Sequence, residues 1–91
     1  MLLYKNITNI IISSAYEVHR LLKNGYLEKV YENALIKELE SRSLSCQQQT
    51  PLEVYYKDYV VGNYIADIIV EDKLVLEIKA ISGIEEQHFA Q

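Results

Sequence analysis

Residues 65–79 read IADIIVEDKLVLEIK, two segments rich in Ile, Val and Leu on either side of the polar triplet Glu71-Asp72-Lys73. Such a pattern is typical of two antiparallel strands joined by a short turn. Asp67, Glu77 and Lys79 nevertheless occupy positions where apolar side chains would pack better. The stretch therefore predicts a hairpin, and the function of its three charged residues has to be explained.

The length of the turn decides whether these charges meet. A three-residue turn at Glu71-Asp72-Lys73 places Asp67 directly opposite Glu77, and opposed residues share a face with Cβ atoms about 4.5–5.5 Å apart. Lys79 lies two residues beyond Glu77 and is expected on the same face. A two-residue turn would put Asp67 on the other face unless a bulge restored the register. The functional interpretation therefore requires the longer turn.

Two carboxylates this close repel each other unless a proton or a cation lies between them. A hard cation such as Mg2+ is held by one or two carboxylates together with water and substrate phosphate. The pattern therefore suggests a metal site with Asp67 and Glu77 as ligands. Lys79 would help place the attacking water and neutralise the scissile phosphate.

The alternative is a solvated sheet face on which Asp67 simply pairs with Lys79, since a lone D…ExK pattern is a weak signal. The expected neighbours on that face are apolar, namely Ile65, Ile69 and Val75. Charges among buried positions are costly without a partner or an ion. This context favours the metal site.

Two amphipathic helices are expected before the strands. Apolar residues recur at three- and four-residue steps over residues 3–23 and 26–41, and Gly25 suits the left-handed conformation that follows a helix. His19 is interpreted as a structural histidine that contacts the second helix or its loop. Tyr31 is interpreted as a core aromatic residue with a tethered hydroxyl rather than a catalyst.

The apolar period then changes from 3.6 to 2, and three strands are predicted, over 45–56, 59–70 and 74–81. Lys57-Asp58 is the expected first turn, Pro51 indicates an edge position or a bulge, and Gly62 a bulge. Residues 84–91 resemble the start of a further helix. The order α-α-β-β-β predicts an α+β fold with a three-stranded, mainly antiparallel sheet packed on helices.

Composition limits the function classes. The 91 residues provide one small domain, and the net charge of −4 argues against a broad basic surface that would grip nucleic-acid phosphates. Bound cations or a partner would have to supply positive charge. The single cysteine, Cys46, excludes an internal disulfide and favours a reducing, cytoplasmic location. The apolar run at 10–12 is too short to span a membrane.

The third predicted strand carries apolar side chains on both faces, so it requires cover on both sides. The two helices can cover only one of them. Either the chain lacks its C-terminal part or a second copy covers the other face. Self-association, with a homodimer as the simplest form, is therefore expected.

At NGYLEKVYENAL the chain resembles the GxxExxY signature, here Gly25, Glu28 and Tyr31, of small bacterial and archaeal domains in the PD-(D/E)xK nuclease-like superfamily. AYEVHRLLKNGYLEKVYENAL, PLEVYYKDYVVGNYIADIIVEDKLVLEIKA and HFAQ follow the order and spacing of that family over nearly the whole chain. The resemblance implies a restriction-endonuclease-like αβββαβ core with the site on the central hairpin. It also implies that residues 1–91 form a single domain without its last helix and strand.

The D…ExK triad of the family matches, by position, Asp67, Glu77 and Lys79. The resemblance makes Glu28 the acidic helix residue that completes such a site, and Glu28 borders the apolar stripe of Leu27 and Tyr31, so it is expected along the helix–sheet interface. A plain alternative is a favourable charge in the first helical turn. Gln91 matches the start of a helix that carries a Gln in the family. Ala66 stands where the superfamily name has Pro, a mild departure.

Two functions remain open. In the first, the protein is a nuclease that hydrolyses phosphodiester bonds of DNA or RNA, with DNA favoured. Mg2+ or Mn2+ would be held by Glu28, Asp67 and Glu77, and Lys79 would assist. His19, Tyr31 and Gln91 would be auxiliary residues. In the second, the domain is a binding or assembly module that has kept the fold and lost the activity, which the net acidity favours.

Overall fold

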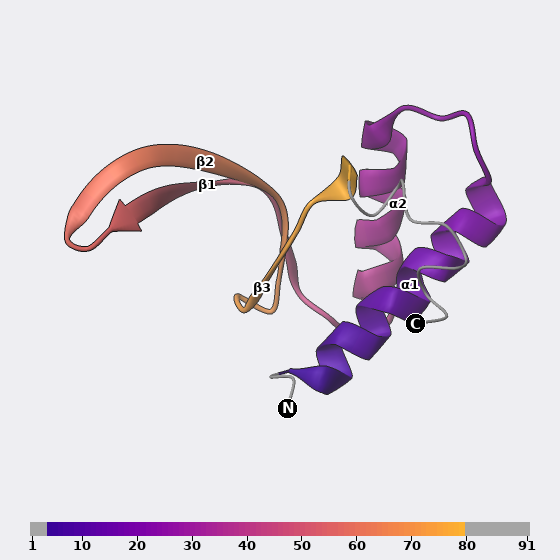
Figure 1. The fold of residues 1–91 in the computed structure, drawn as a ribbon. Helices are drawn as coiled ribbons and strands as arrows, with labels where there is room; N and C mark the ends of the chain where they lie inside the picture. Colours follow the sequence, from indigo (N-terminus) through magenta and orange to yellow (C-terminus); the bar gives the residue numbers. More distant parts are fainter. Residues whose placement is uncertain (1–3, 80–91) are drawn as a thin grey trace.

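The computed structural model describes residues 4–79 of the chain. Its elements are, in order, α1 (Lys5–Leu22), α2 (Glu28–Ser41), β1 (Cys46–Tyr56), β2 (Tyr59–Val70) and β3 (Leu74–Leu76) (Figure 1). Two helices followed by a three-stranded antiparallel sheet make an α+β fold, and the predicted element order is confirmed. The further helix expected from residue 84 lies outside the described residues.

The sheet has the order β1-β2-β3, and both predicted turns are confirmed. Tyr56 pairs with Tyr59 around Lys57-Asp58. Val70 pairs with Leu74 around the three-residue turn that the functional interpretation requires. Turn geometry and hydrophobic alternation together fixed this register.

The special residues of the strands also lie as expected. Pro51 is in β1, which is an edge strand of the sheet, where the missing N–H costs no hydrogen bond inside the ladder. The β1–β2 register shifts between Val54 and Tyr55, beside the pairing of Val54 with Gly62. The bulge that Gly62 predicted is therefore present.

The third strand is shorter than the predicted 74–81. It ends at Leu76, and Ile78 and Lys79 already belong to a helical turn. The Ile78 N–H donates a hydrogen bond of 2.9 Å to the Asp67 Oδ2 atom, so a side-chain carboxylate of β2 replaces a backbone partner of the ladder. Ile78 is only 2% exposed, because the turn directs it into the core. A tertiary contact thus ends the strand early.

The helices cover only the base of the sheet (Figure 1). The core joins side chains of both helices, the end of β2 and the segment after β3, as follows: Ile11, Val18, Tyr31, Leu35, Leu39, Ile68, Val70 and Ile78. The distal part of the β1–β2 hairpin curves away from the helices. We call this distal part, residues 51–65, the hairpin arm.

The loop between the helices is held by Tyr31, which is 8% exposed. Its hydroxyl donates a hydrogen bond to the Lys23 carbonyl oxygen and accepts one from the Tyr26 N–H. The His19 ring stacks on the Tyr31 ring with 5.7 Å between centroids. The predicted tethered hydroxyl is confirmed, and His19 contacts the second helix as a structural histidine should. Two residues of this loop take a positive φ, namely Lys23 directly after α1, with φ +60°, and Gly25, with φ +107°.

Candidate functional site

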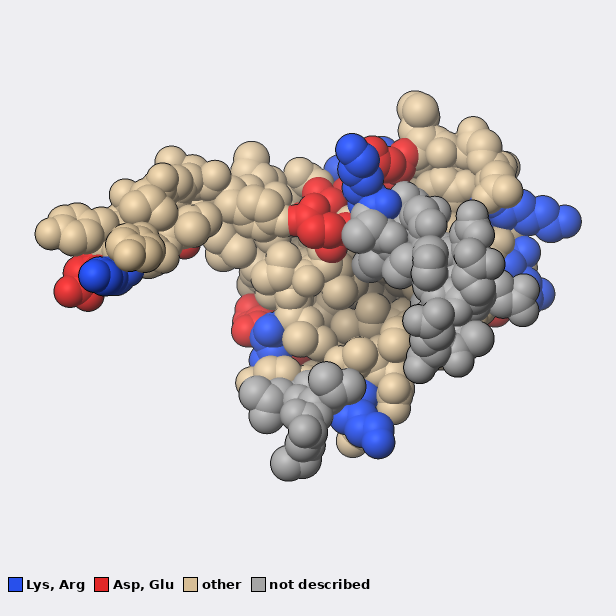
Figure 2. Space-filling view, viewed as in Figure 1, with Lys and Arg blue, Asp and Glu red and all other residues tan. Residues whose placement is uncertain are grey.

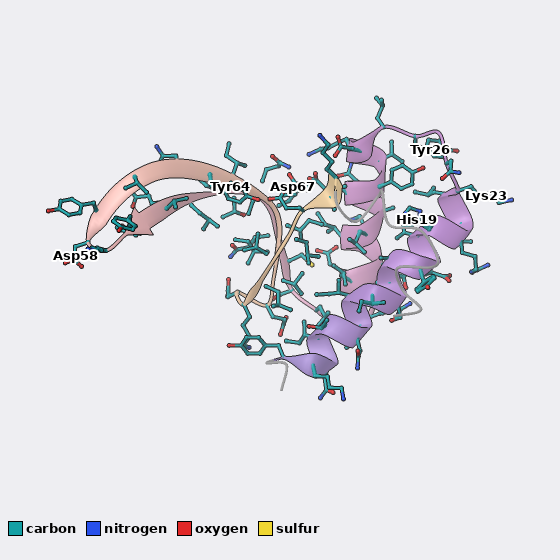
Figure 3. All side chains as sticks on the ribbon, in the orientation of Figure 1. His19, Lys23, Tyr26, Asp58, Tyr64 and Asp67 are labelled. Carbon is teal, nitrogen blue, oxygen red and sulfur yellow. The ribbon has the colours of Figure 1, made fainter. Side chains whose placement is uncertain are left out.

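Asp67 lies at the junction where β2 passes from the hairpin arm to the helices (Figure 3). It is half-buried, and both of its carboxylate oxygens accept hydrogen bonds. Oδ2 binds the Ile78 N–H, and Oδ1 accepts from the Gln49 Nε2 atom at 3.3 Å. Its orientation is therefore fixed from two elements, the start of the helical turn after β3 and strand β1.

Gln49 lies opposite Asp67 but is not paired with it. Gln48 pairs with Ile68 and Thr50 with Ala66, whereas Gln49 between them takes φ +51°. A left-handed conformation is unfavourable for a glutamine, and such strain gathers at functional sites more often than elsewhere. The local backbone change lets the Gln49 side chain contact both helix α2 and Asp67.

The helical residue that faces these glutamines is Glu32, which is 4% exposed. Its carboxylate accepts hydrogen bonds from Gln48 Nε2, from Gln49 Nε2 at 3.2 Å and from Lys29 Nζ at 3.1 Å. Burial raises the pKa of Glu32, but these three donors together outweigh it, and the net pKa lies below the ordinary value. Glu32 is therefore an ionised carboxylate held at the interface between helix and sheet.

A single amide nitrogen joins the two carboxylates. Gln49 Nε2 is 3.2 Å from both oxygens of Glu32 and 3.3 Å from Oδ1 of Asp67. We name Glu32, Gln48, Gln49 and Asp67 the junction cluster. Figure 2 shows acidic atoms gathered at this junction, with a basic side chain beside them. The N–H2 group places partial positive charge between two negative groups, which is the electrostatic role that a cation would take.

The junction cluster contains two carboxylates, a ligand type that Mg2+ and Mn2+ prefer, whereas both glutamines direct their amide nitrogens towards Glu32. Within residues 4–79, no three His, Cys, Asp or Glu side chains lie close enough together to hold a metal ion. Mg2+ commonly uses only one or two carboxylates and completes its shell with water and phosphate oxygens. Glu32 and Asp67 supply two such carboxylates, and in the structure the Gln49 Nε2 atom lies between them.

Glu28 is not at this interface. It is the first residue of α2 and is exposed, and Leu27 before it is 80% exposed. The expected position of Glu28 along the helix–sheet interface is therefore corrected. The helix starts at Glu28, two residues later than predicted. One turn further on, at the i+4 position, Glu32 takes the place expected of Glu28.

Glu77 and Lys79 differ from expectation for a related reason. Both are exposed, and β3 ends before either of them, so strand pairing does not hold Glu77 opposite Asp67. The apolar surroundings expected on this face are also only partly buried, since Ile65 is 58% and Val75 48% exposed, while Ile69 is buried. Asp67 is instead contacted by the backbone N–H of Ile78, the residue between Glu77 and Lys79 in the sequence. Gln91 lies outside the described residues.

Sequence reasoning missed Glu32, Gln48 and Gln49. A signal existed, because Glu32 follows Glu28 by one helical turn and adjoins the buried Tyr31. The tract Gln47-Gln48-Gln49 was a second signal, since a polar run inside a strand needs polar partners when it packs against other elements. The β1–β2 register would have placed it opposite Asp67.

A clasp at the other end of the hairpin fixes this register. The Ser45 N–H and Oγ both donate to Glu71 Oε2, at 2.6 and 2.9 Å, and the Glu71 N–H donates to the Ser45 carbonyl oxygen. The bond from the Ser45 backbone N–H is the main reason why the pKa of Glu71 is lowered. The clasp locks the turn between β2 and β3, and so the position of Asp67 along β2.

Cys46 is unsuited to nucleophilic chemistry. It is half-buried at the start of β1, and burial, with the carboxylates of Glu40 and Glu71 nearby, raises the pKa of its thiol. A raised pKa reduces the thiolate fraction, and the thiolate is the reactive form.

A family model described as the PD-(D/E)XK nuclease superfamily matches residues 5–91. The chain belongs to this superfamily. Members of the PD-(D/E)XK superfamily usually hydrolyse phosphodiester bonds and generally use divalent metals. No curated protein and no solved structure matched the chain.

The superfamily part of the resemblance is thus confirmed over almost the whole chain. The helix α2 and the three strands agree with the first elements of the αβββαβ core that it implied. Among residues 4–79, the PD-(D/E)XK domain has no helix long and apolar enough to cross a membrane.

Proposed function

We propose that this chain is a metal-dependent nuclease domain of the GxxExxY branch of its superfamily and that it hydrolyses phosphodiester bonds of DNA. Asp67 and Glu32 hold Mg2+ or Mn2+, with water and substrate phosphate completing its shell. Glu77 is exposed and does not converge with these two carboxylates in the structure, so it would have to turn towards them to act as a third ligand. The observation that carries the proposal is the Gln49 amide nitrogen within 3.3 Å of both carboxylates, Glu32 and Asp67.

The residues of the domain have distinct tasks in this proposal. Gln48 and Gln49 hold Glu32 ionised, and the Ile78 N–H holds the Asp67 carboxylate in one orientation. Lys79 neutralises charge on the scissile phosphate and orients the attacking water. A bound divalent cation supplies Lewis-acid polarisation of the phosphate and a lowered pKa of water.

The net charge of −4 is compatible with a nucleic-acid substrate if a divalent cation is bound at the junction cluster. A cation bound between Asp67 and Glu32 reverses the local sign of charge, so that the junction attracts phosphate instead of repelling it. The single Cys46 supports a cytoplasmic location as part of the same proposal.

The test is cleavage of plasmid and single-stranded DNA, with RNA for comparison, in Mg2+ or Mn2+. We expect wild-type cleavage to be lost with EDTA and to fall by about 10- to 100-fold in Asp67→Asn and Glu32→Gln, as is typical when the support of a metal ligand is removed. Glu40→Gln is the matched control, since Glu40 is exposed on the same helix. Cleavage that survives both site substitutions points to a contaminant and refutes the proposal.

The second candidate is a nuclease-fold binding module without activity. It is favoured by the junction cluster having only two carboxylates among the described residues and by the net negative charge. Mn2+ binding by the wild-type protein, lost in Asp67→Asn, without cleavage of any substrate would select this function.

A further inference from the structure

The hairpin arm, residues 51–65, is a two-stranded ribbon with two open edges (Figure 1). Within the described residues, β1 is an edge strand, and β3 pairs only with Ile68–Val70 of β2. Two-stranded ribbons without a third strand or a packed helix are marginally stable in water. The arm is therefore a segment whose stability calls for an additional contact.

The side chains of the arm are unusually apolar for an exposed ribbon. Eight large apolar residues are between 37% and 71% exposed, namely Val54, Tyr55, Tyr56, Tyr59, Val60, Val61, Tyr64 and Ile65. Their exposed surface, summed over both faces of the ribbon, is roughly 800 Å2, given the size of such side chains. One partner contributes about this area to a standard protein interface, so a partner must contact more than one face of the arm to bury it.

Both faces of the ribbon carry this apolar surface. Paired residues share a face, so Tyr64 lies with Leu52 on one side, and Ile65 lies with Pro51 on the other. Tyr64 is 37% exposed and Ile65 58%. Because both sides of the ribbon are apolar, a partner has to contact one face directly and reach the other face around an edge strand.

The low number of charged residues in the arm indicates which class of partner it can bind. Its only ionisable side chains, tyrosines aside, are Glu53, Lys57 and Asp58, and Figure 2 shows most of the arm without charge. Nucleic acid and anionic membranes both require clustered Lys and Arg, which the arm lacks. A second copy of the same arm meets little repulsion, because one lysine offsets one of the two carboxylates. The surface therefore suits a protein partner and is compatible with itself.

We propose that the hairpin arm is a dimerisation element, in which two copies of this chain pack their arms against each other about a two-fold axis. The same patch serves on both copies, as in an isologous interface. The unpaired backbone groups of β1 in one copy can form hydrogen bonds with the arm of the other copy. The tyrosines are large aromatic side chains of the kind that contributes most of the binding energy in interfaces. This proposal does not depend on the nuclease function.

The test is multi-angle light scattering after size exclusion on the whole 91-residue protein. We expect about twice the chain mass of 10.6 kDa for the wild type. Tyr55→Lys and Tyr59→Lys, at positions 59% and 71% exposed, should raise the dissociation constant at least tenfold. Leu27→Lys is the matched control, because Leu27 is 80% exposed but lies outside the arm, and it should leave the dimer intact.

A second measurement keeps the proposal testable if a lysine variant folds poorly. Val61→Cys in a Cys46→Ser background should cross-link two copies through a short bismaleimide, whereas Leu21→Cys, which is equally exposed on α1, should not. A wild-type monomer at several hundred micromolar overturns the proposal. Dissociation caused equally by Leu27→Lys, or cross-linking of both cysteine variants alike, also overturns it.

Discussion

Glu32 is the residue whose charge the fold must accommodate, since it is ionised and 4% exposed. Its folded-state pKa lies below the ordinary carboxyl value near 4.5, because the donors from Gln48, Gln49 and Lys29 outweigh burial. The folded state therefore takes up a proton less readily than the unfolded state. Ionised Glu32 stabilises the fold above that ordinary value, and this contribution is lost as the pH falls through the lowered pKa.

Replacing Glu32 by Gln should consequently lower the free energy of unfolding at neutral pH. It should also make that free energy depend less on pH in the acid range. The new amide N–H2 would face the N–H2 groups of Gln48 and Gln49, and a buried polar group left without a partner costs about 1–3 kcal/mol. Urea unfolding at pH 7 and at pH 3.5 measures both effects. Glu40→Gln, on the exposed side of the same helix, should leave the acid dependence unchanged. Parallel pH curves for wild type and Glu32→Gln would contradict the assignment.

Ser14 presents the opposite situation, a buried hydroxyl without a partner. It is 0% exposed, and its Oγ makes no hydrogen bond to any described residue. We expect Ser14→Ala to stabilise the protein by about 1 kcal/mol, because it removes an unsatisfied group and improves helix propensity. Ser13→Ala is the matched control in denaturant unfolding. Ser13 Oγ binds Arg42 and the Ile10 carbonyl, so its loss should bring no gain.

At the scale of elements, sequence reasoning was most successful where local patterns act alone. The strand pairs around Lys57-Asp58 and around Glu71-Asp72-Lys73 followed from turn residues and alternation. The early end of β3 did not, because it depends on the Asp67 carboxylate binding the Ile78 N–H across the sheet. Glu28 is exposed whereas Glu32, one turn further along α2, is buried against β1. This difference depends on how the helix packs on the sheet, which no local pattern contains.

The loop between α1 and α2 offers a direct test of one local pattern. Gly25 has φ +107°, and a Cβ atom added there would meet nothing within 4 Å. Any cost of Gly25→Ala therefore comes from the backbone conformation, and we expect a loss of about 1 kcal/mol. Gly62 has equal space around it but no positive φ. Gly62→Ala should be neutral or slightly stabilising in the same thermal unfolding experiment. Equal effects of the two changes would show that φ is not the cause.

At the scale of the whole molecule, the junction cluster is where α2, β1 and β2 meet, so a ligand bound there connects all three elements. A cation that binds only the folded state stabilises the entire domain, by about 2.7 kcal/mol at a concentration 100 times its dissociation constant. We therefore expect Mn2+ to raise the melting temperature of the wild-type protein. EDTA should reverse the rise.

The pattern of loss among variants distinguishes the two helical carboxylates. If Glu32 and Asp67 hold the cation, Glu32→Gln and Asp67→Asn each abolish the Mn2+ response, while Glu28→Gln keeps it, because Glu28 is exposed at the first position of α2. Each variant is compared with itself with and without Mn2+, so a change in basal stability does not disturb the comparison. A response lost in Glu28→Gln and kept in Glu32→Gln would return the helical ligand to the position that the sequence motif first indicated.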